Sequence, residues 1–212
     1  MMRETLFFDM DGTLIDSEPG IVAGIEHTFS QLGRPVPSQL RRWIGPPLRD
    51  SFQSQLDDPA LVTQALELYR QRYDRRGWSE HTIYAGIGET VETLHAAGHR
   101  VAVVTSKNER FARRIAEHLP FGHCFEDVVG ASDDGERRFK PDLIAEAMRR
   151  LSVAPEQCWM IGDRRMDIEG ARHHGMRNIG VLWGFGDEAE LRTAGAVRLA
   201  QHPQELPALL AA

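Results

Sequence analysis

A short apolar run that ends abruptly at two carboxylates constrains this chain more than any other feature. Residues 6–8 are Leu-Phe-Phe between polar neighbours, which is typical of a strand covered on both faces in a parallel sheet. Asp9 and Asp11 follow directly, and Gly12 allows the chain to turn tightly behind them. Because ligands of open α/β sheets bind beyond the carboxyl ends of the strands, this run predicts acids at a binding site.

The two acids allow two interpretations. Carboxylates about 4 Å apart repel each other by roughly 4 kcal/mol at an effective dielectric constant of about 20, so a close pair needs a cation or a shared proton. A divalent metal ion would meet that need. In the alternative interpretation, Asp9 and Asp11 only cap a turn with Gly12. These residues by themselves do not decide between the two.

The composition indicates a globular protein without affinity for polyanions. The chain has 212 residues, 42% hydrophobic and 26% charged, enough to bury a full core in one domain or in one domain with an insertion. A formal net charge of -6 and the lack of a dense basic stripe disfavour a nucleic acid polymer as partner. Cys124 and Cys158 lie in apolar contexts, and no window suits a signal peptide or a membrane span. We therefore expect a cytoplasmic protein with reduced cysteines and no membrane partner.

The spacing of apolar residues divides the chain into two parts. Residues 17–82 show helical spacing, which predicts a small all-helical lid inserted after the first strand. From residue 86 onward, helices and buried strands alternate. The predicted strands are 101–104, 127–131, 158–161 and 179–182, and the predicted helices are 86–98, 109–119 with Asn108 as N-cap, one beginning at Pro141, and 168–174.

Further polar residues stand at the ends of these elements. Thr105 ends the strand 101–104, and Asp163 follows the strand 158–161 with Asp167 four residues later. Lys140 stands at a helix start, where a cation opposes the helix dipole, so we expect an anion opposite it. The alternative is that Lys140 is a surface lysine and that the two acids only suit the dipole of the helix that follows them.

Together, these positions favour phosphoryl transfer. Carboxylates suit Mg²⁺, which leaves room for substrate phosphate oxygens, and a carboxylate that forms an aspartyl phosphate is an established nucleophile for this reaction. The chain contains neither a Gly-x-x-x-x-Gly-Lys-Ser/Thr loop nor a Gly-x-Ser-x-Gly elbow. P-loop and serine hydrolase functions are thereby excluded.

In order and position, these motifs resemble those of the haloacid dehalogenase superfamily. The matching positions are Asp9-Met-Asp11-Gly-Thr-Leu for its first motif, Thr105 for its second, Lys140 for its third and Gly162-Asp163-x-x-x-Asp167 for its fourth. The resemblance implies an α/β fold whose Rossmann-like core, residues 1–16 and 83–212, contains a parallel sheet. It also implies an inserted all-helical cap domain, residues 17–82.

The resemblance assigns a role to each position. It implies Asp9 as nucleophile and Asp11 as general acid and base, in an enzyme whose cofactor is Mg²⁺. The metal would be held by Asp9, the main-chain carbonyl of Asp11 and Asp163, with Asp167 supporting them from outside the ligand set. The residues implied to bind the transferring phosphoryl group are Gly12, Thr105, Ser106 and Lys140.

Within the superfamily, the chain is similar to the phosphoglycolate phosphatase-like group and most similar to its 5'-nucleotidase branch. The segments that carry this similarity are Trp43-Ile-Gly-Pro-Pro-Leu, Gly162-Asp-Arg and Leu182-Trp-Gly-Phe-Gly. Arg164 departs from the Ser or Thr that phosphoglycolate phosphatases more often carry. We therefore expect a Mg²⁺-dependent phosphomonoester hydrolase acting on 5'-nucleotides. Phosphoglycolate or another small phosphate ester is the alternative substrate, and a phosphomutase or a non-catalytic binding protein is the alternative function.

Substrate choice is expected to depend on the cap. Catalytic groups on strand ends are open to water, so residues 17–82 should close over them and contact the leaving group. The candidates for this recognition are Trp43, Arg49 and Phe52 of the cap and Phe185 of the core. An aromatic ring could stack on a base and an arginine could bind a second anion, whereas helix packing is the alternative role of each aromatic residue. The sequence predicts no oligomeric state.

Overall fold

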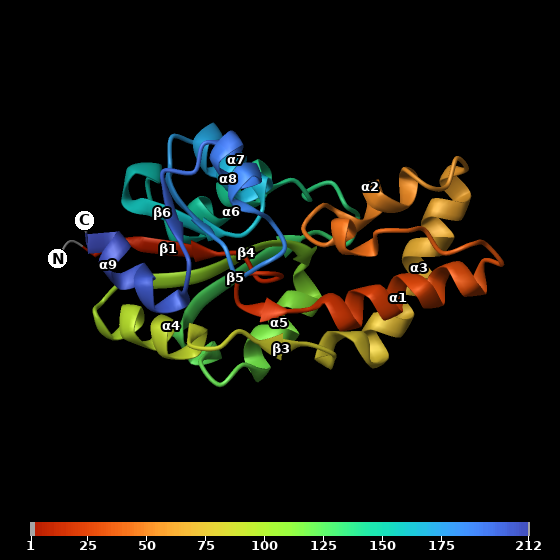
Figure 1. Ribbon diagram of the computed structural model, residues 1–212, viewed down its shortest axis with the longest axis horizontal. Helices are drawn as coiled ribbons and strands as arrows, with labels where there is room; N and C mark the ends of the chain where they lie inside the picture. The colour runs from red at the N-terminus through yellow and green to blue at the C-terminus, as the bar shows by residue number, and fades with distance from the viewer. Residues whose placement is uncertain (1–2, 212) are drawn as a thin grey trace.

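The computed structural model describes residues 3–211 and shows a six-stranded sheet in the order β5-β4-β1-β6-β7-β8 (Figure 1). Every neighbouring pair is parallel, and β1 lies between β4 and β6. The strands are β1 (Thr5–Phe8), β4 (Arg100–Asn108), β5 (Phe125–Ala131), β6 (Cys158–Gly162), β7 (Arg177–Val181) and β8 (Arg198–Ala200). The core helices are α4 (Ile87–Ala96), α5 (Glu109–His118), α6 (Lys140–Leu151), α7 (Arg165–His173), α8 (Glu188–Ala194) and α9 (Leu206–Ala211). The predicted α/β fold is confirmed.

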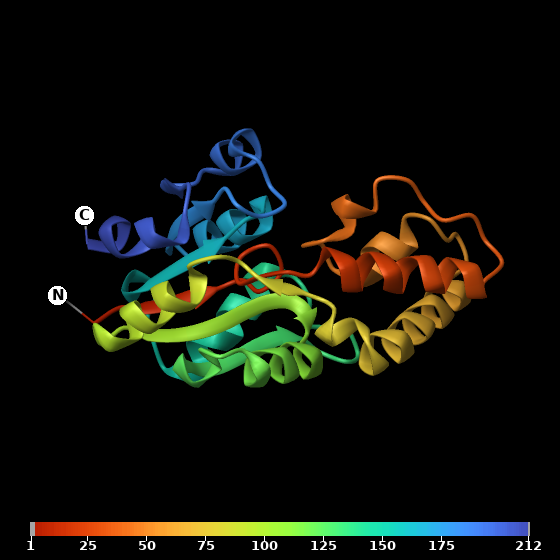
Figure 2. The same ribbon diagram turned by 60° about the horizontal axis from the view of Figure 1, so that its bottom comes forward.

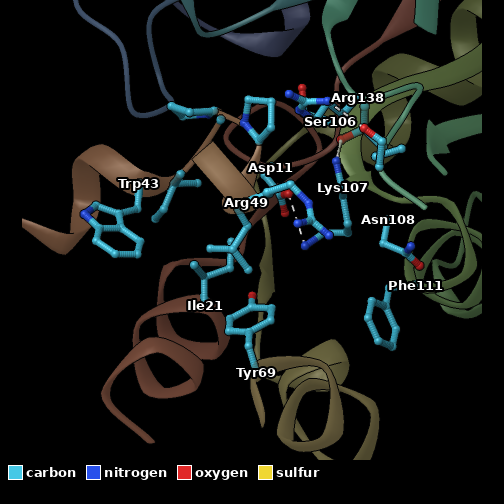
Figure 3. Close-up of a pocket in the computed structure, with 18 of the residues that line it drawn as sticks. Asp11, Ile21, Trp43, Arg49, Tyr69, Ser106, Lys107, Asn108, Phe111 and Arg138 are labelled. Carbon is cyan, nitrogen blue, oxygen red and sulfur yellow. Dashed lines mark hydrogen bonds and ion pairs between the residues drawn. The ribbon is translucent and has the colours of Figure 1, made fainter. Parts of the chain in front are cut away.

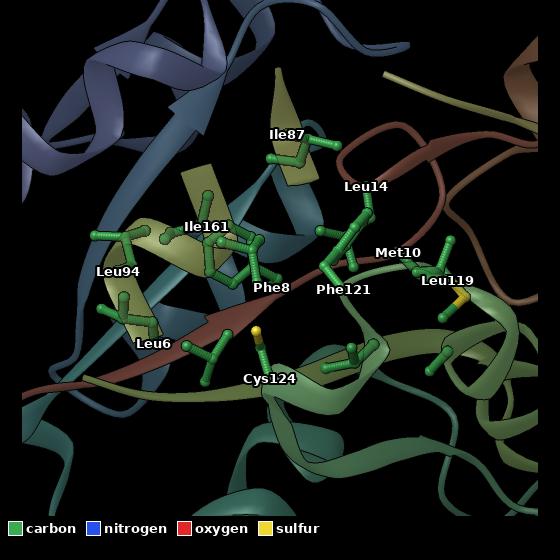
Figure 4. Close-up of a cluster of buried hydrophobic side chains, with 14 of the residues drawn as sticks. Leu6, Phe8, Met10, Leu14, Ile87, Leu94, Leu119, Phe121, Cys124 and Ile161 are labelled. Atoms are coloured by element: carbon green, nitrogen blue, oxygen red, sulfur yellow. The ribbon is translucent and has the colours of Figure 1, made fainter. Parts of the chain in front are cut away.

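Helices cover both faces of the sheet because the side chains of β1 alternate between them. Leu6 and Phe8 pack with residues of α4, α5 and α9 on one face (Figure 4). Phe7 packs with residues of α6 and α7 on the other face. All three side chains are completely buried. With both faces covered, the carboxyl end of β1 is the place where this strand can present polar groups to a ligand.

Three α-helices and two short 3-10 helices form the inserted part, which lies beyond the carboxyl ends of the core strands; Figure 2 shows it as a separate lobe. The α-helices are α1 (Glu18–Gln31), α2 (Leu48–Gln53) and α3 (Pro59–Arg75). α3 begins at Pro59, and the Asp58 side chain accepts a hydrogen bond from the Ala60 N–H at 2.8 Å, which caps the helix. The helices enclose an apolar cluster, which includes Ile25, Phe29, Phe52 and Tyr69 and is joined by Phe111 of the core helix α5.

Two short strands connect the lobes. β2 (Ile15–Asp16) leads out of the core, β3 (Thr82–Ile83) leads back, and the two pair antiparallel. The predicted boundaries therefore fall on this pair. The division into a core domain of residues 1–16 and 83–212 and a cap domain of residues 17–82 stays a prediction.

The starts of α7 and α5 differ from what the sequence predicts, and the structure shows why. α7 begins at Arg165 rather than at Ile168, because the Asp167 carboxylate accepts a hydrogen bond from the Arg164 N–H at 3.0 Å and completes the first turn. Asn108 does precede α5, but its side chain donates to Asp133 Oδ1 at 2.7 Å instead of capping the helix. The Asp167 contact therefore moves the start of α7, and the Asp133 contact removes the predicted cap of α5.

Cys124 and Cys158 lie in the interior and form no disulfide within residues 3–211. None of the helices in the described part of the chain combines the length and the apolar composition that a membrane crossing requires. The cytoplasmic location stays a prediction.

Candidate active site

The site begins where β1 ends. Asp9 and Asp11 are both buried, and the Asp9 N–H donates to the Ile161 carbonyl at 2.9 Å, which ties this strand end to β6. Gly12 has a φ of 86°, and a Cβ at this position would lie 2.2 Å from Asp163 Oδ2. Glycine therefore lets the turn after Asp11 pass directly against Asp163.

Three buried carboxylates gather at this strand end. Asp9, Asp163 and Asp167 each offer an oxygen that lies within 4.8 Å of the others. Lys140, the first residue of α6, places its Nζ 2.9 Å from Asp9 Oδ1 and 2.7 Å from Asp167 Oδ1. Its Nζ also donates to the Val104 carbonyl at 2.9 Å. The anion expected opposite Lys140 is thus supplied by two carboxylates of the protein itself.

Burial and mutual repulsion raise the pKa values within this cluster. Burial raises the pKa of Asp9 to about 6 against the opposing effect of Lys140, and Asp167 raises it further. Burial, followed by Asp167 and Asp9, raises the pKa of Asp163 well above its ordinary value. Burial acts to lower the pKa of Lys140, but Asp167 and Asp9 outweigh this effect and raise it. The three acids therefore share one ammonium group that stays charged.

This donor set fits a magnesium ion. Mg²⁺ prefers hard carboxylate oxygens, and one ammonium leaves three buried acids short of positive charge. Asp163 is oriented by hydrogen bonds from Thr13 Oγ1 at 3.2 Å and from the Phe185 N–H at 2.8 Å. Both oxygens of Asp167 are engaged, one by Lys140 and the other by the N–H that precedes α7, which suits a supporting role. The ligand set of Asp9, Asp163 and the Asp11 carbonyl stays a prediction.

The end of β4 supplies the opposite side of the site. Thr105 is buried, and its Oγ1 accepts a hydrogen bond from the Lys107 N–H at 3.3 Å. Lys107 Nζ lies 3.1 Å from Asp11 Oδ2 (Figure 3) and 2.8 Å from the Tyr73 hydroxyl of α3. The other oxygen of Asp11, Oδ1, is buried and has no hydrogen-bond partner among residues 3–211. One oxygen of Asp11 is therefore held while the other is free.

A cavity of about 110 Å³ lies between the core and the cap at this point (Figure 3). Its core side includes Asp9, Asp11, Thr105, Ser106, Lys107, Phe111 and Arg138. Its cap side includes Trp43, Arg49, Tyr69, Arg70 and Tyr73. Asp9 thus belongs both to the acid cluster and to the cavity, so a group bound in the cavity can reach a carboxylate of the cluster.

The predicted site residues separate into two layers. Asp9, Asp11, Thr105 and Ser106 line the cavity. The other predicted residues of the core motifs, Gly12, Lys140, Asp163 and Asp167, are not among the lining residues in the described part of the chain. They contact Asp9 or one another behind the cavity wall.

The four predicted specificity residues also separate. Trp43 and Arg49 line the cavity, whereas Phe52 and Phe185 are not among its lining residues within residues 3–211. Phe52 is 0% exposed and packs edge-on against Trp43, with ring centroids 5.4 Å apart. Arg41 lies over the Phe185 ring, 5.2 Å from its centroid. Phe52 is therefore a packing residue of the cap, which is the alternative role expected for each aromatic residue.

Several cavity residues carry no site prediction from the sequence. Tyr69 and Tyr73 are four residues apart on one helix face, a signal that could have placed them together. Lys107 follows Thr105 closely and is one of only two lysines in the chain. Arg138 had no comparable signal, because it reaches the cavity from the segment before α6 and pairs there with Asp50 of the cap at 3.2 Å.

Comparison with known proteins places this arrangement in a family. The sequence profile of haloacid dehalogenase-like hydrolases matches residues 6–181. A 5'-nucleotidase of Pseudomonas aeruginosa is 40% identical over 190 residues, which cover 88% of this chain and 86% of that protein. A phosphoglycolate phosphatase of Pseudomonas putida is 30% identical over 190 residues, with 85% and 70% covered.

Other similarities agree with this placement. The tyrosine-protein kinase PtkA of Mycobacterium tuberculosis is 40% identical over 186 residues, or 86% of this chain, which spans 63% of the length of PtkA. The crystal structure of a predicted phosphatase from Clostridium acetobutylicum superimposes with a TM-score of 0.94 at 34% identity, covering 100% of both chains. The fold, the profile match and the identity to the nucleotidase together show that this chain belongs to the haloacid dehalogenase-like hydrolase family.

Proposed function

We propose that the protein is a Mg²⁺-dependent phosphomonoester hydrolase in which Asp9 forms an aspartyl phosphate. One observation carries this proposal: Asp9 is both a wall of the cavity and a member of the buried acid cluster. A phosphate ester in the cavity would therefore meet a carboxylate nucleophile beside a site suited to a divalent cation. When bound, Mg²⁺ would neutralise phosphate charge and orient the phosphoryl group.

The side chains divide the chemistry between them. An oxygen of Asp9 forms a bond to phosphorus while the bond from phosphorus to the ester oxygen breaks, and that oxygen takes a proton from Asp11. In the second half, Asp11 takes a proton from water, the water oxygen bonds to phosphorus, and Asp9 is released with inorganic phosphate. Lys140 holds Asp9 Oδ1 at 2.9 Å, so the orientation of the nucleophile does not depend on the substrate. Thr105 and Ser106 stand on the cavity wall where they can donate to phosphoryl oxygens.

The substrate class we propose is a 5'-nucleotide. The nucleotidase relative supports this choice, and so does the presence of Trp43 on the cap side of the cavity. Stacking of a base on an aromatic ring is worth about 1 to 3 kcal/mol, enough for a tenfold or larger preference. Among the four predicted specificity residues, Trp43 is the aromatic side chain that could contribute this contact, since it lines the cavity and Phe52 lies inside the cap.

A second candidate substrate is a small phosphate ester with a carboxylate, such as phosphoglycolate. Arg49 of the cap and Arg138 of the core both line the cavity, and a guanidinium binds a carboxylate through paired hydrogen bonds. The phosphoglycolate phosphatase relative supports this candidate. No contact among residues 3–211 specifically favours a phosphomutase or a non-catalytic binding protein.

The deciding experiment is phosphate release from a matched panel of esters. The panel contains 5'-nucleoside monophosphates, phosphoglycolate and sugar phosphates, each assayed with Mg²⁺ and with excess chelator, alongside Asp9→Asn. We expect turnover that requires Mg²⁺ and Asp9, with the highest kcat/KM for a 5'-nucleotide. Full activity in chelator would overturn the metal requirement. A best substrate of phosphoglycolate would overturn only the nucleotide assignment, and transfer from ATP to a tyrosine peptide without ester hydrolysis would favour a kinase.

A further inference from the structure

The chain uses lysine at only two places, and both are in the candidate active site. Lysine and arginine together number 25, and Lys107 and Lys140 are the only lysines. Each pairs with one of the two acids that follow β1: Lys140 with Asp9, and Lys107 with Asp11. Their side chains are 2% and 6% exposed. Everywhere else the chain uses arginine, so these are the two positions where an ammonium stands in place of a guanidinium.

The two cations differ in shape and in the directions of their donors. An ammonium is a compact charge whose three donors can turn toward oxygens in different directions, whereas a guanidinium is a larger planar fork. Lys107 Nζ contacts two oxygens from different lobes, Asp11 Oδ2 at 3.1 Å and the Tyr73 hydroxyl at 2.8 Å. It also lies 4.6 Å from the centroid of the Tyr73 ring. Lys107 therefore connects the cap helix α3 to Asp11.

Tyr73 is a suitable neutral partner for this ammonium. Its side chain is 1% exposed and stacks on Tyr69, with ring centroids 5.4 Å apart. Burial and the nearby charge of Asp11 raise the pKa of Tyr73 well above its ordinary value, so the hydroxyl stays protonated. Within residues 3–211, Lys107 thus has one ion-pair partner, Asp11, and no second charged partner from the cap, whose Tyr73 hydroxyl is neutral.

We propose that Lys107 is a positioning residue for the general acid Asp11 and that Tyr73 secures it from the cap. By holding Asp11 Oδ2, Lys107 fixes the orientation of a carboxyl group on the cavity wall, where the oxygen of the leaving group would need a proton. The inference rests on the proposed function, because a positioned acid matters only if an ester bond is cleaved. It also gives the cap a part in catalysis besides covering the site, since the acid is held from both lobes.

The test separates acid positioning from a purely structural role through the leaving group. We compare kcat/KM for p-nitrophenyl phosphate, which needs little protonation, and for an alkyl phosphate, which needs much. Lys107→Met is expected to lower the value for the alkyl ester by about 100-fold and the value for the aryl ester by less than about threefold. Tyr73→Phe should show the same selectivity with a loss of about tenfold for the alkyl ester, and Asp11→Asn sets the upper limit.

Two control variants are included. One tests the loss of a different contact between cap and core, and the other tests the loss of a different tyrosine hydroxyl. Arg114→Met removes another cation that links the lobes, since Arg114 bonds Asp74 of the cap at 3.3 Å without touching Asp11. Any loss it causes should be equal for the two esters. Tyr84→Phe deletes the hydroxyl of a core tyrosine that is not among the cavity-lining residues of the described part of the chain, and it should keep the wild-type ratio between the esters.

The small number of lysines provides a second, spectroscopic readout. Labelling with ¹³C-lysine gives side-chain signals from only two residues, and Lys107→Arg assigns them by deleting one set. Tyr73→Phe should shift the Lys107 signal and leave the Lys140 signal in place.

Three outcomes are decisive. Equal losses for both esters in Lys107→Met, or an unmoved Lys107 signal in Tyr73→Phe, would overturn the inference while an active wild type upholds the proposed function. A wild type that hydrolyses no ester would overturn the proposed function and the inference with it. Selective loss for the alkyl ester together with the shifted signal would support both.

Discussion

Among the single residues of the candidate site, Asp9 combines three features. It touches Lys140, lines the cavity and shares the acid cluster. Asp9→Asn is expected to lower phosphate release by about 10³-fold or more, because an amide cannot form an acyl phosphate. Circular dichroism should show an intact fold, since the substitution is nearly isosteric. Near-normal turnover in this variant would assign the nucleophile to another residue.

The same residue has a pH signature in the metal-free protein. The pKa of Asp9 is raised to about 6 from an ordinary 3.8, chiefly by burial, so ionised Asp9 destabilises the fold at pH above about 6. This cost diminishes as the pH falls from about 6 toward 4, where the folded-state carboxyl is protonated. In chelator, Asp9→Asn should therefore be more stable than the wild type at pH 7, and the difference should shrink by pH 4. Urea unfolding at several pH values measures it, and a difference that grows toward low pH would contradict the assignment.

Among the elements of the cap, helix α2 carries one side chain that lines the cavity and another that packs inside the cap. Arg49, in α2, lines the cavity, whereas Phe52 of the same helix is enclosed among cap rings. Arg49→Met should lower kcat/KM for phosphoglycolate by about tenfold or more, because a charged hydrogen bond is worth roughly 1.5 to 3 kcal/mol. It should change values for 5'-nucleotides much less.

The neighbouring Phe52→Leu is the matched control for this experiment. It should destabilise the protein by roughly 1 kcal/mol through lost packing while leaving the ratio of kcat/KM between the two substrate classes unchanged. Steady-state kinetics with both substrates and a thermal melt test both expectations. A changed substrate ratio in Phe52→Leu, or an unchanged one in Arg49→Met, would remove α2 from substrate choice.

At the scale of the whole molecule, the acid cluster joins elements that are distant in the sequence. Asp9 follows β1, Asp163 follows β6, and Asp167 lies in α7. A metal that binds only the folded state should stabilise all of them at once, by about 2.7 kcal/mol at a hundredfold excess over Kd, or roughly 5 to 10 °C in Tm. Asp163→Asn should reduce this Mg²⁺-dependent shift.

Asp187→Asn is a suitable control for the melting experiment. Asp187 is an acid that caps α8 at 2.8 Å from the Glu190 N–H and lies outside the cluster, and Asn caps helices about as well as Asp. Its Mg²⁺-dependent shift should equal that of the wild type. If Mg²⁺ failed to raise the Tm of the wild type, or raised that of Asp163→Asn equally, the cluster would not be the metal site.

The local pattern of residues was enough to predict the sheet and the acids at its edge. Apolar runs of strand length, each followed by a polar residue, predict parallel strands, and the carboxyl ends of such strands share one edge whatever covers them. The predicted α/β fold is confirmed, and Asp9, Asp163 and Asp167 meet at that edge. These features depend on the local pattern of apolar and polar residues and on the order of strands and helices along the chain. Both can be inferred from the sequence. The predicted roles of these residues still require the experiments above.

The contacts between cap and core could not be predicted from the residue pattern. Phe52 lies inward while Arg49 faces the cavity, Tyr73 meets Lys107, and Arg138 reaches Asp50. Each depends on how one lobe is placed against the other, which is set by packing between residues far apart in the chain. Helical periodicity says which residues share a face, but it does not say which face meets the core and which remains inside the cap.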